Sequence, residues 1–132
     1  MDLNGVRTLA DLPRVQARLR PNDPAQIDTG VTTTFAELNA RASRIANRLI
    51  AEGIRPQERI AYLSKNSNHF LPFLLGACKA RITLAPINFR LAVPEIAFIL
   101  GDSSASLLFV GPDFAEAAVT FDDGETRRGW NP

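Results

Sequence analysis

The sequence has few of the residues from which disulfides and metal centres are built. Cys78 is the single cysteine, which excludes an intrachain disulfide and a cysteine-based metal cluster. Because its neighbours are apolar, we expect a buried free thiol. His69 is the single histidine, so a metal site built on paired histidines is excluded as well.

Long apolar runs are also missing. No run approaches the ~18–20 residues needed to cross a bilayer. The N-terminus, Met1–Gly5, lacks a basic segment followed by an apolar stretch. The sequence therefore predicts neither a secretory signal nor a membrane span, and the cytoplasm is the expected compartment.

Charge of one sign is not concentrated anywhere in the chain. The formal net charge is +1, and the only adjacent basic residues are Arg127 and Arg128. This balance argues against nucleic acid or an anionic membrane surface as a partner. The chain of 132 residues is 45% hydrophobic, which is enough for one domain with a real core.

Two glycine-rich phosphate-binding patterns are missing as well. None of the eight glycines has the Gly-x-Gly spacing that lets a backbone approach a pyrophosphate. There is also no Gly-x-x-x-x-Gly-Lys-Ser/Thr loop. Nucleotide binding through either pattern is not supported.

The elements that are present alternate between strand and helix. Helices are expected at 8–19, between Thr34 and Gly53, from Asn66 or Ser67 to Ala80, and at 92–100. A short hairpin is expected around Thr29-Gly30, followed by strands at 60–63, 82–86 and 106–110. The regular spacing of these strands suits right-handed crossovers. The predicted fold class is α/β, a Rossmann-like layered parallel sheet with flanking helices.

Helical spacing also predicts which faces are buried. In the first helix, the expected inward residues are Leu9, Leu12, Val15 and Leu19. In the last long helix they are Val93, Ile96, Ala97 and Leu100, with Gly101 ending the helix. The helix after Thr34 begins with a capping box to Glu37 and carries a row of arginines, interpreted as a solvated face with supporting ion pairs.

Loops that follow the strands are the places where a parallel sheet binds ligands. Ser64–Ser67 and Asn88–Arg90 occupy these positions, but helix capping and turn chemistry explain Asn66, Ser67 and Asn88. Lys65 and Arg90 are single charges without a converging partner. His69, in the first turn of a helix, is expected to be structural or solvent-facing. No residue is therefore assigned to catalysis, cofactor binding or metal binding.

The apolar pattern that predicts helices and strands becomes weaker towards the C-terminus. Asp113 is expected to cap one short helical turn through Ala118. Residues 119–132 show little apolar periodicity, so we divide the chain into a domain at 1–118 and a loose tail at 119–132, with Trp130 weakly packed.

Several motifs in a fixed order resemble a known family. They are Pro24–Asp28, Thr34–Asn39, Ala46–Leu49, Gly53–Pro56, Arg59–Leu63 with Asn66-Ser67, Lys79-Ala80, Ala85–Leu91, Glu95–Leu100 and Asp102-Ser103. Together they resemble the opening of adenylate-forming enzymes, the AMP-binding acyl-CoA synthetases and acid–CoA ligases. The likeness covers about residues 8–115 and implies part of that family's large N-terminal domain.

The resemblance implies chemistry that this chain does not itself carry. The family's enzymes use ATP and Mg to form an acyl-adenylate from a carboxylic acid, and the synthetases then transfer the acyl group to coenzyme A. The phosphate loop, the aromatic–Thr–Glu motif, the ribose-binding Asp and the catalytic Lys have no counterparts here. A local departure is Arg81, where the family commonly has Gly, and we expect the large cation to alter packing.

The leading hypothesis is an N-terminal portion of an ATP-dependent fatty-acid or other carboxylic acid–CoA ligase, either a gene fragment or one piece of a split protein. It would be inactive alone and would meet its acid substrate only in a full-length enzyme. The alternative is a non-catalytic interaction module that self-associates or docks a partner chain through an exposed sheet edge. A third hypothesis, an independent nucleotide-binding protein, lacks a phosphate loop.

Overall fold

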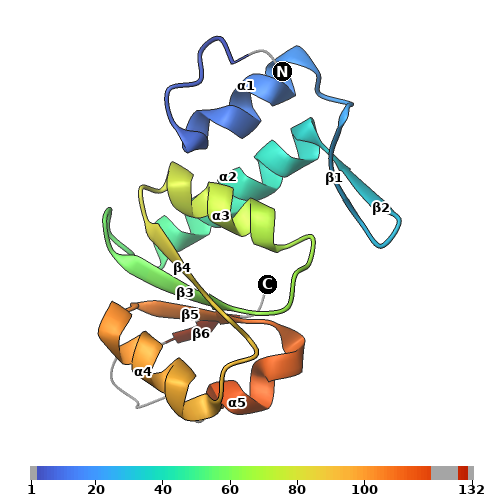
Figure 1. Cartoon of the computed structure of the whole chain (residues 1–132). Coiled ribbons are helices and arrows are strands. Elements are labelled where there is room, and N and C mark those ends of the chain that lie inside the picture. The colour runs from blue at the N-terminus through green and yellow to red at the C-terminus, as the bar shows by residue number, and fades with distance from the viewer. Residues whose placement is uncertain (1–2, 120–127, 131–132) are drawn as a thin grey trace. The chain divides into compact units, whose positions relative to one another are not determined.

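A computed structural model describes residues 3–119 and 128–130. The predicted α/β class with a parallel sheet is confirmed. The chain divides into two units (Figure 1): the first comprises Met1–Arg55 and Asn66–Arg81, and the second comprises Pro56–Lys65 and Ile82–Pro132.

The first unit consists of helices and one hairpin. Its elements are η1 (Leu9–Asp11), α1 (Leu12–Leu19), β1 (Pro24–Asp28), β2 (Val31–Thr34), α2 (Phe35–Ala51) and α3 (Phe70–Lys79). Strands β1 and β2 pair antiparallel around Thr29 and Gly30, whose φ angles are 47° and 82°. Two consecutive positive φ angles are those of a type I′ turn, so the predicted hairpin is confirmed.

Helix α2 begins and ends as the sequence predicts. The Thr34 hydroxyl accepts a hydrogen bond from the Glu37 amide at 3.3 Å, and the Thr34 amide donates to the Glu37 carboxylate at 2.8 Å. This reciprocal pair satisfies two amides that the first turn leaves open. Gly53 closes the helix with φ of 82°.

Helices α2 and α3 pack closely because a glycine lies between them. A Cβ atom at Gly76 would lie 2.7 Å from Cγ2 of Ile45 and 2.9 Å from the carbonyl oxygen of Ala42. Both distances are shorter than ordinary van der Waals contact, so only glycine fits this position without movement. The same helix buries Phe73 and Leu75, as its mostly apolar sequence predicts.

The first and third helices depart from the predictions at their ends. Thr8 does precede the first helix, but that helix opens with the 3-10 turn η1. Leu9 and Leu19 are 48% and 54% exposed, so their predicted inward orientation is wrong. The buried face of α1 instead carries Pro13, Val15 and Gln16.

Helix α3 begins at Phe70, later than the predicted cap at Asn66 or Ser67. The Ser67 hydroxyl accepts a hydrogen bond from the His69 amide at 3.3 Å, so Ser67 organises the turn that leads into the helix. The segment from Asn66 to His69 is therefore a loop.

The second unit is built around a four-stranded parallel sheet. Its elements are β3 (Arg59–Leu63), β4 (Thr83–Ile87), α4 (Val93–Ser103), β5 (Leu107–Val110), η2 (Pro112–Phe114), α5 (Ala115–Val119) and β6 (Arg128–Trp130). The strand order is β4-β3-β5-β6, with every neighbouring pair parallel. The predicted strands at 60–63, 82–86 and 106–110 are confirmed as β3, β4 and β5.

The core of the second unit joins the sheet to α4. Ala61, Leu63 and Leu108 pack with Ile96 and Leu100 of α4 in one buried cluster. Alternate strand residues and helical residues four apart share a face, which explains why these side chains meet.

The boundaries and faces of α4 were partly mispredicted. The helix continues past Gly101 to Ser103 and ends where Ser104 adopts a left-handed conformation with φ of 51°. The predicted inward positions Val93 and Ala97 are exposed. The face of α4 that packs against the sheet is therefore narrower than its apolar sequence suggests.

The C-terminal predictions are covered in part by the described residues. A short helix runs through Ala118, as predicted, within α5, but Asp113 lies inside the preceding turn η2 and is not its cap. Most of the predicted loose tail at 119–132 lies outside the described residues, and so does the side chain of Trp130. Within that tail, residues 128–130 form β6, which pairs with β5. Within residues 3–119 and 128–130, every helix is too short or too polar to cross a membrane.

Candidate functional site

The carboxyl ends of three strands meet at one edge of the second unit's sheet. Leu63 pairs with Ile87 of β4 and with Val110 of β5. The loops that follow these residues therefore begin side by side. This is the edge at which parallel sheets bind ligands, and it contains the sequence-predicted candidates Lys65 and Arg90.

The loops after β3 and β5 are packed directly against each other. The Gly111 amide donates to the carbonyl oxygen of Leu63 at 2.8 Å. A Cβ atom at Gly111 would overlap the hydroxyl of Ser64, so a glycine is needed there for the close approach. Lys65 Nζ lies 2.8 Å from a carboxylate oxygen of Asp113. The prediction that Lys65 lacks a partner is wrong.

The loop after β4 is occupied by local interactions too. The Asn88 side-chain oxygen accepts from the Arg90 amide at 3.0 Å, which confirms the turn chemistry expected of Asn88. The Arg90 guanidinium lies 5.5 Å from the centre of the Phe89 ring, and that ring lies 5.9 Å from the ring of Phe114. Lys65 and Arg90 thus occupy the same edge but engage different partners.

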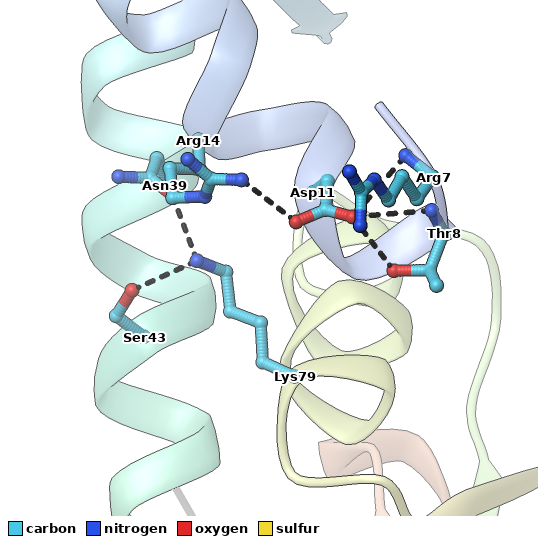
Figure 2. Close-up of polar contacts among 7 residues, drawn as sticks. All are labelled: Arg7, Thr8, Asp11, Arg14, Asn39, Ser43 and Lys79. Carbon is cyan, nitrogen blue, oxygen red and sulfur yellow. Dashed lines mark hydrogen bonds and ion pairs between the residues drawn. The ribbon is translucent and has the colours of Figure 1, made fainter. Parts of the chain in front are cut away.

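A second polar cluster lies among the helices of the first unit (Figure 2). Lys79 Nζ donates to Oδ1 of Asn39 at 2.8 Å and to Oγ of Ser43 at 3.1 Å. These bonds join α3 to α2 over about forty positions of sequence. Asn39 and Lys79 lie in family-like motifs of the sequence, but their hydrogen bond is not among the sequence-based predictions.

The pKa values of Lys79 and Asp11 are both lowered by their surroundings. Partial burial, together with the neighbouring positive charge of Arg14, lowers the pKa of Lys79 below its ordinary value. Hydrogen bonds from Arg14, Arg7 and Thr8 lower the pKa of Asp11 to about 2. Both groups act as structural hydrogen-bonding partners.

The arginine row of α2 behaves largely as the sequence predicts. Arg48 forms an ion pair with Glu52 at 2.6 Å. Arg41 Nη2 lies 3.4 Å from Nδ1 of His69, which is exposed as expected. Surface pairs of this kind contribute little to stability and do not converge on a common point.

The remaining candidates form no reactive centre among the described residues. Cys78 is half-buried and not fully buried as expected, and desolvation raises the pKa of its thiol above the ordinary value. A raised pKa makes the thiolate scarcer and the sulfur less reactive. In residues 3–119 and 128–130, no group of His, Cys, Asp and Glu side chains could hold a metal ion.

Comparison with known proteins explains why the chain has several motifs in a fixed order but no reactive centre among its described residues. The sequence profile described as "AMP-binding enzyme" matches residues 13–128. The chain belongs to the AMP-binding enzyme family.

Curated members of the AMP-binding family resemble the chain over most of its length. The fatty acid–[acyl-carrier-protein] ligase ScoC of Streptomyces coeruleorubidus is 38% identical over 83% of this chain and 21% of its own length. A feruloyl-CoA synthase of Amycolatopsis is 39% identical over 91% of this chain and 24% of its own length. The chain thus spans about a fifth to a quarter of these relatives.

Solved AMP-binding enzymes also share the fold. A fatty acyl CoA synthetase of Mycobacterium tuberculosis matches 92% of this chain and 26% of its own, with a TM-score of 0.84 and 33% identity. The N-terminal domain of FACL13 from the same organism matches 92% of this chain and 33% of its own, with a TM-score of 0.84 and 32% identity. The structure described here is therefore the N-terminal part of the AMP-binding fold.

The departure at Arg81 has a backbone explanation. Arg81 directly follows the C-cap of α3 and adopts φ of 62°, in the left-handed region that glycine populates readily. Its side chain is exposed, so the expected disturbance of packing is not observed. The consequence of having arginine here is backbone strain at the end of the helix.

Proposed function

We propose that the chain is the N-terminal scaffold segment of an AMP-forming acid–CoA ligase, which activates a fatty acid or another carboxylic acid with ATP. The observation that supports this proposal most directly is the profile match over residues 13–128. The relatives' names include a fatty acid ligase and a feruloyl-CoA synthase, which act on different acids. The acid, ATP, Mg and coenzyme A belong to the complete enzyme, and we place that enzyme in the cytoplasm, where ATP and coenzyme A are abundant.

The polar side chains of the chain support a scaffold role. Lys79 holds α2 and α3 together, while Lys65 and Arg90 are engaged by neighbours within their own unit. None of these groups is paired with a nucleophile or base in the geometry that acyl transfer requires. We therefore expect the isolated chain to form no acyl-adenylate.

The test measures carboxylate-dependent exchange of labelled pyrophosphate into ATP. The purified chain should give no exchange above a blank with any of several fatty and aromatic acids. A chimera in which this chain replaces the matching 120-residue stretch of the Amycolatopsis feruloyl-CoA synthase should exchange with ferulate. Exchange by the chain alone, or a folded chimera without exchange, would contradict the proposal.

A further inference from the structure

The loop that precedes η1 contains the one Asn-Gly pair of the sequence, Asn4-Gly5. The Val6 amide donates to the carbonyl oxygen of Leu3 at 3.0 Å, so the pair occupies the two central positions of a turn. Gly5 has a φ of 83°, which is the conformation of the third residue of a type II turn and favours glycine. Both residues of the pair are exposed, so the turn presents an accessible side-chain amide next to a glycine.

The side-chain amide of an asparagine can react with the main chain of the residue that follows it. The backbone nitrogen of Gly5 is separated from Cγ of Asn4 by a few covalent bonds, so the two atoms are close without help from any other group. Glycine has no Cβ that would hinder their approach. Asn-Gly is therefore the pair in which such an attack meets the least steric resistance.

The attacking nitrogen is also available at Gly5. No described residue accepts a hydrogen bond from the Gly5 amide. Asn22 offers a contrast within the same unit, because it too is exposed and lies in a turn. The amide that follows it, that of Asp23, donates to the carbonyl oxygen of Arg20 at 3.3 Å. A hydrogen-bonded amide must give up its bond before its nitrogen can attack.

The Asn-Gly pair borders a cavity of about 260 Å³ that also contains positive charge. The rest of the lining comes from α1: Arg14, Val15, Arg18 and Leu19. Residues four apart on a helix share a face, which brings the two guanidiniums to one side of the cavity. A water molecule takes about 30 Å³ in the liquid, so the cavity has room for several.

The two arginines differ in how much of their charge is offset. Arg14 lies 2.8 Å from a carboxylate oxygen of Asp11, and the other oxygen of that carboxylate accepts from the amides of Arg7 and Thr8 (Figure 2). Arg18 forms no ion pair with any residue that the structure describes. The charge of Arg18 therefore acts on its surroundings more strongly than that of Arg14.

We propose that Asn4 is a site of spontaneous deamidation and that the guanidiniums beside the cavity promote the reaction. The Gly5 nitrogen loses its proton to hydroxide and bonds to Cγ of Asn4, and the bond from Cγ to Nδ2 breaks as ammonia leaves with a proton from water. Negative charge develops on the nitrogen and on the side-chain oxygen during the attack, and nearby cations stabilise it.

Water completes the reaction by opening the cyclic imide. Breaking the new bond between the Gly5 nitrogen and Cγ gives aspartate at position 4. Breaking the original bond between that nitrogen and the main-chain carbonyl carbon of Asn4 gives isoaspartate. Either product carries a carboxylate beside Arg14 and Arg18. The reaction needs only water and this chain, so it does not depend on the proposed ligase activity.

The experiment incubates the purified chain at mildly alkaline pH and follows each asparagine by mass spectrometry of proteolytic peptides. Labelling by an isoaspartate methyltransferase identifies the isoaspartate product. Asn4 should convert at least about tenfold faster than Asn22, because the Asp23 amide is held in a hydrogen bond. Comparable rates at the two positions would overturn the proposal.

A pair of glycine variants separates the reaction from backbone strain. Gly5→Ala should slow the conversion of Asn4 by about tenfold, because the added Cβ hinders the attack. Gly30→Ala is the matched control, since Gly30 has a φ of 82°, has nothing within 4 Å of an added Cβ and does not follow an asparagine. It should leave the conversion of Asn4 unchanged. Equal rates in the two variants would overturn the proposal.

A set of arginine variants tests the role of the cavity. Arg18→Met should slow the conversion of Asn4 by about threefold, and Arg14→Met should slow it less. Arg44→Met removes the same charge from an exposed position on α2 that does not line the cavity, and it should have no effect. Circular dichroism should show that all variants are folded. Unchanged conversion in Arg18→Met, or equal slowing in Arg44→Met, would overturn the assignment of a promoting role to the cavity.

Discussion

The two units of the chain use their polar residues in different ways. In the first unit, hydrogen bonds from Lys79 to α2 and from Asn68 to Asp28 join elements far apart in sequence. In the second unit, the strand-end loops interact through Ser64, Gly111 and the exposed pair of Lys65 with Asp113. Basic residues outnumber acidic ones in the first unit, and the reverse holds in the second. A sequence motif in this chain can therefore mark either a long-range hydrogen bond or a local turn.

The largest expected effect concerns the close packing of the first unit. Gly76→Ala should lower the free energy of unfolding by about 3 kcal/mol, because the added methyl meets Ile45 and the Ala42 carbonyl. Urea denaturation followed by circular dichroism measures the change. Gly101→Ala is the control in α4, where nothing lies within 4 Å, and it should raise stability by about 1 kcal/mol. Equal effects at both positions would contradict the difference in packing.

The corresponding close approach in the second unit lies at Gly111. Gly111→Ala should lower the free energy of unfolding by about 2 kcal/mol, because its methyl would overlap the Ser64 side chain. Its φ of −67° suits any residue, so no backbone strain contributes. Adding Ser64→Gly should recover more than half of the loss in a double-mutant cycle. Independent, additive effects would show that the two loops do not touch.

The two lysines should differ in how much they contribute to stability. Lys79→Met should lower the free energy of unfolding by about 1–2 kcal/mol, because Asn39 and Ser43 lose a charged donor in a half-buried place. Lys65→Met should lower it by less than about 0.5 kcal/mol, because its ion pair is exposed. Chemical denaturation at neutral pH compares them. A larger loss of stability in Lys65→Met than in Lys79→Met would contradict the conclusion that the stabilising long-range hydrogen bond lies in the first unit.

A smaller effect is expected where the family pattern is broken. Arg81→Gly should raise the free energy of unfolding by about 1 kcal/mol, because glycine relieves the left-handed strain at φ of 62°. Arg81→Ala retains a Cβ and should leave stability nearly unchanged. If both substitutions stabilise the chain equally, the arginine side chain and not its backbone is responsible.

The smallest effect is a change in titration. The pKa of Asp11 should be about 2 by carbon-13 NMR of its carboxyl group, and Arg14→Ala should move it towards 3.8, since Arg14 is the strongest of its hydrogen-bonding partners. The sign follows from linkage: stability from this carboxylate is present above pH 3.8 and is lost as the pH falls towards 2. An unchanged pKa in the variant would assign the shift to Arg7 and Thr8.

Much of the fold could be predicted because many helix ends, turns and strands are determined by residues that are close together in the sequence. The capping box of Thr34 with Glu37, the turn at Thr29-Gly30 and the apolar strand of Ile60 are set by neighbouring residues. Helix faces were harder to predict. Leu19 is exposed while Gln16 is buried, because Gln16 accepts a hydrogen bond from Arg20, which in turn lies over the Phe35 ring. Spacing alone does not contain that tertiary contact.

The candidate site was predicted in its location but not in its contacts. The parallel pairing that brings Leu63, Ile87 and Val110 to one edge follows from the crossovers that the strand spacing indicates, whereas the strand order itself comes from the structure. The pairing of Lys65 with Asp113, and of Lys79 with Asn39, joins residues about forty or more positions apart. No periodic pattern encodes such pairs, so they were found from the structure.

The parallel pairing of β4 with β3 has a consequence for how this sheet can grow. The Thr83 amide donates to the carbonyl oxygen of Glu58, on the β3 side, so the backbone groups of Leu84 and Pro86 point away from β3. Proline has no amide hydrogen, and the outer margin of β4 is thus short of a donor in the middle of the strand. A polypeptide that pairs with the β4 margin would therefore lack one main-chain hydrogen bond, and stacking of successive molecules along that margin into a continuous ribbon is disfavoured.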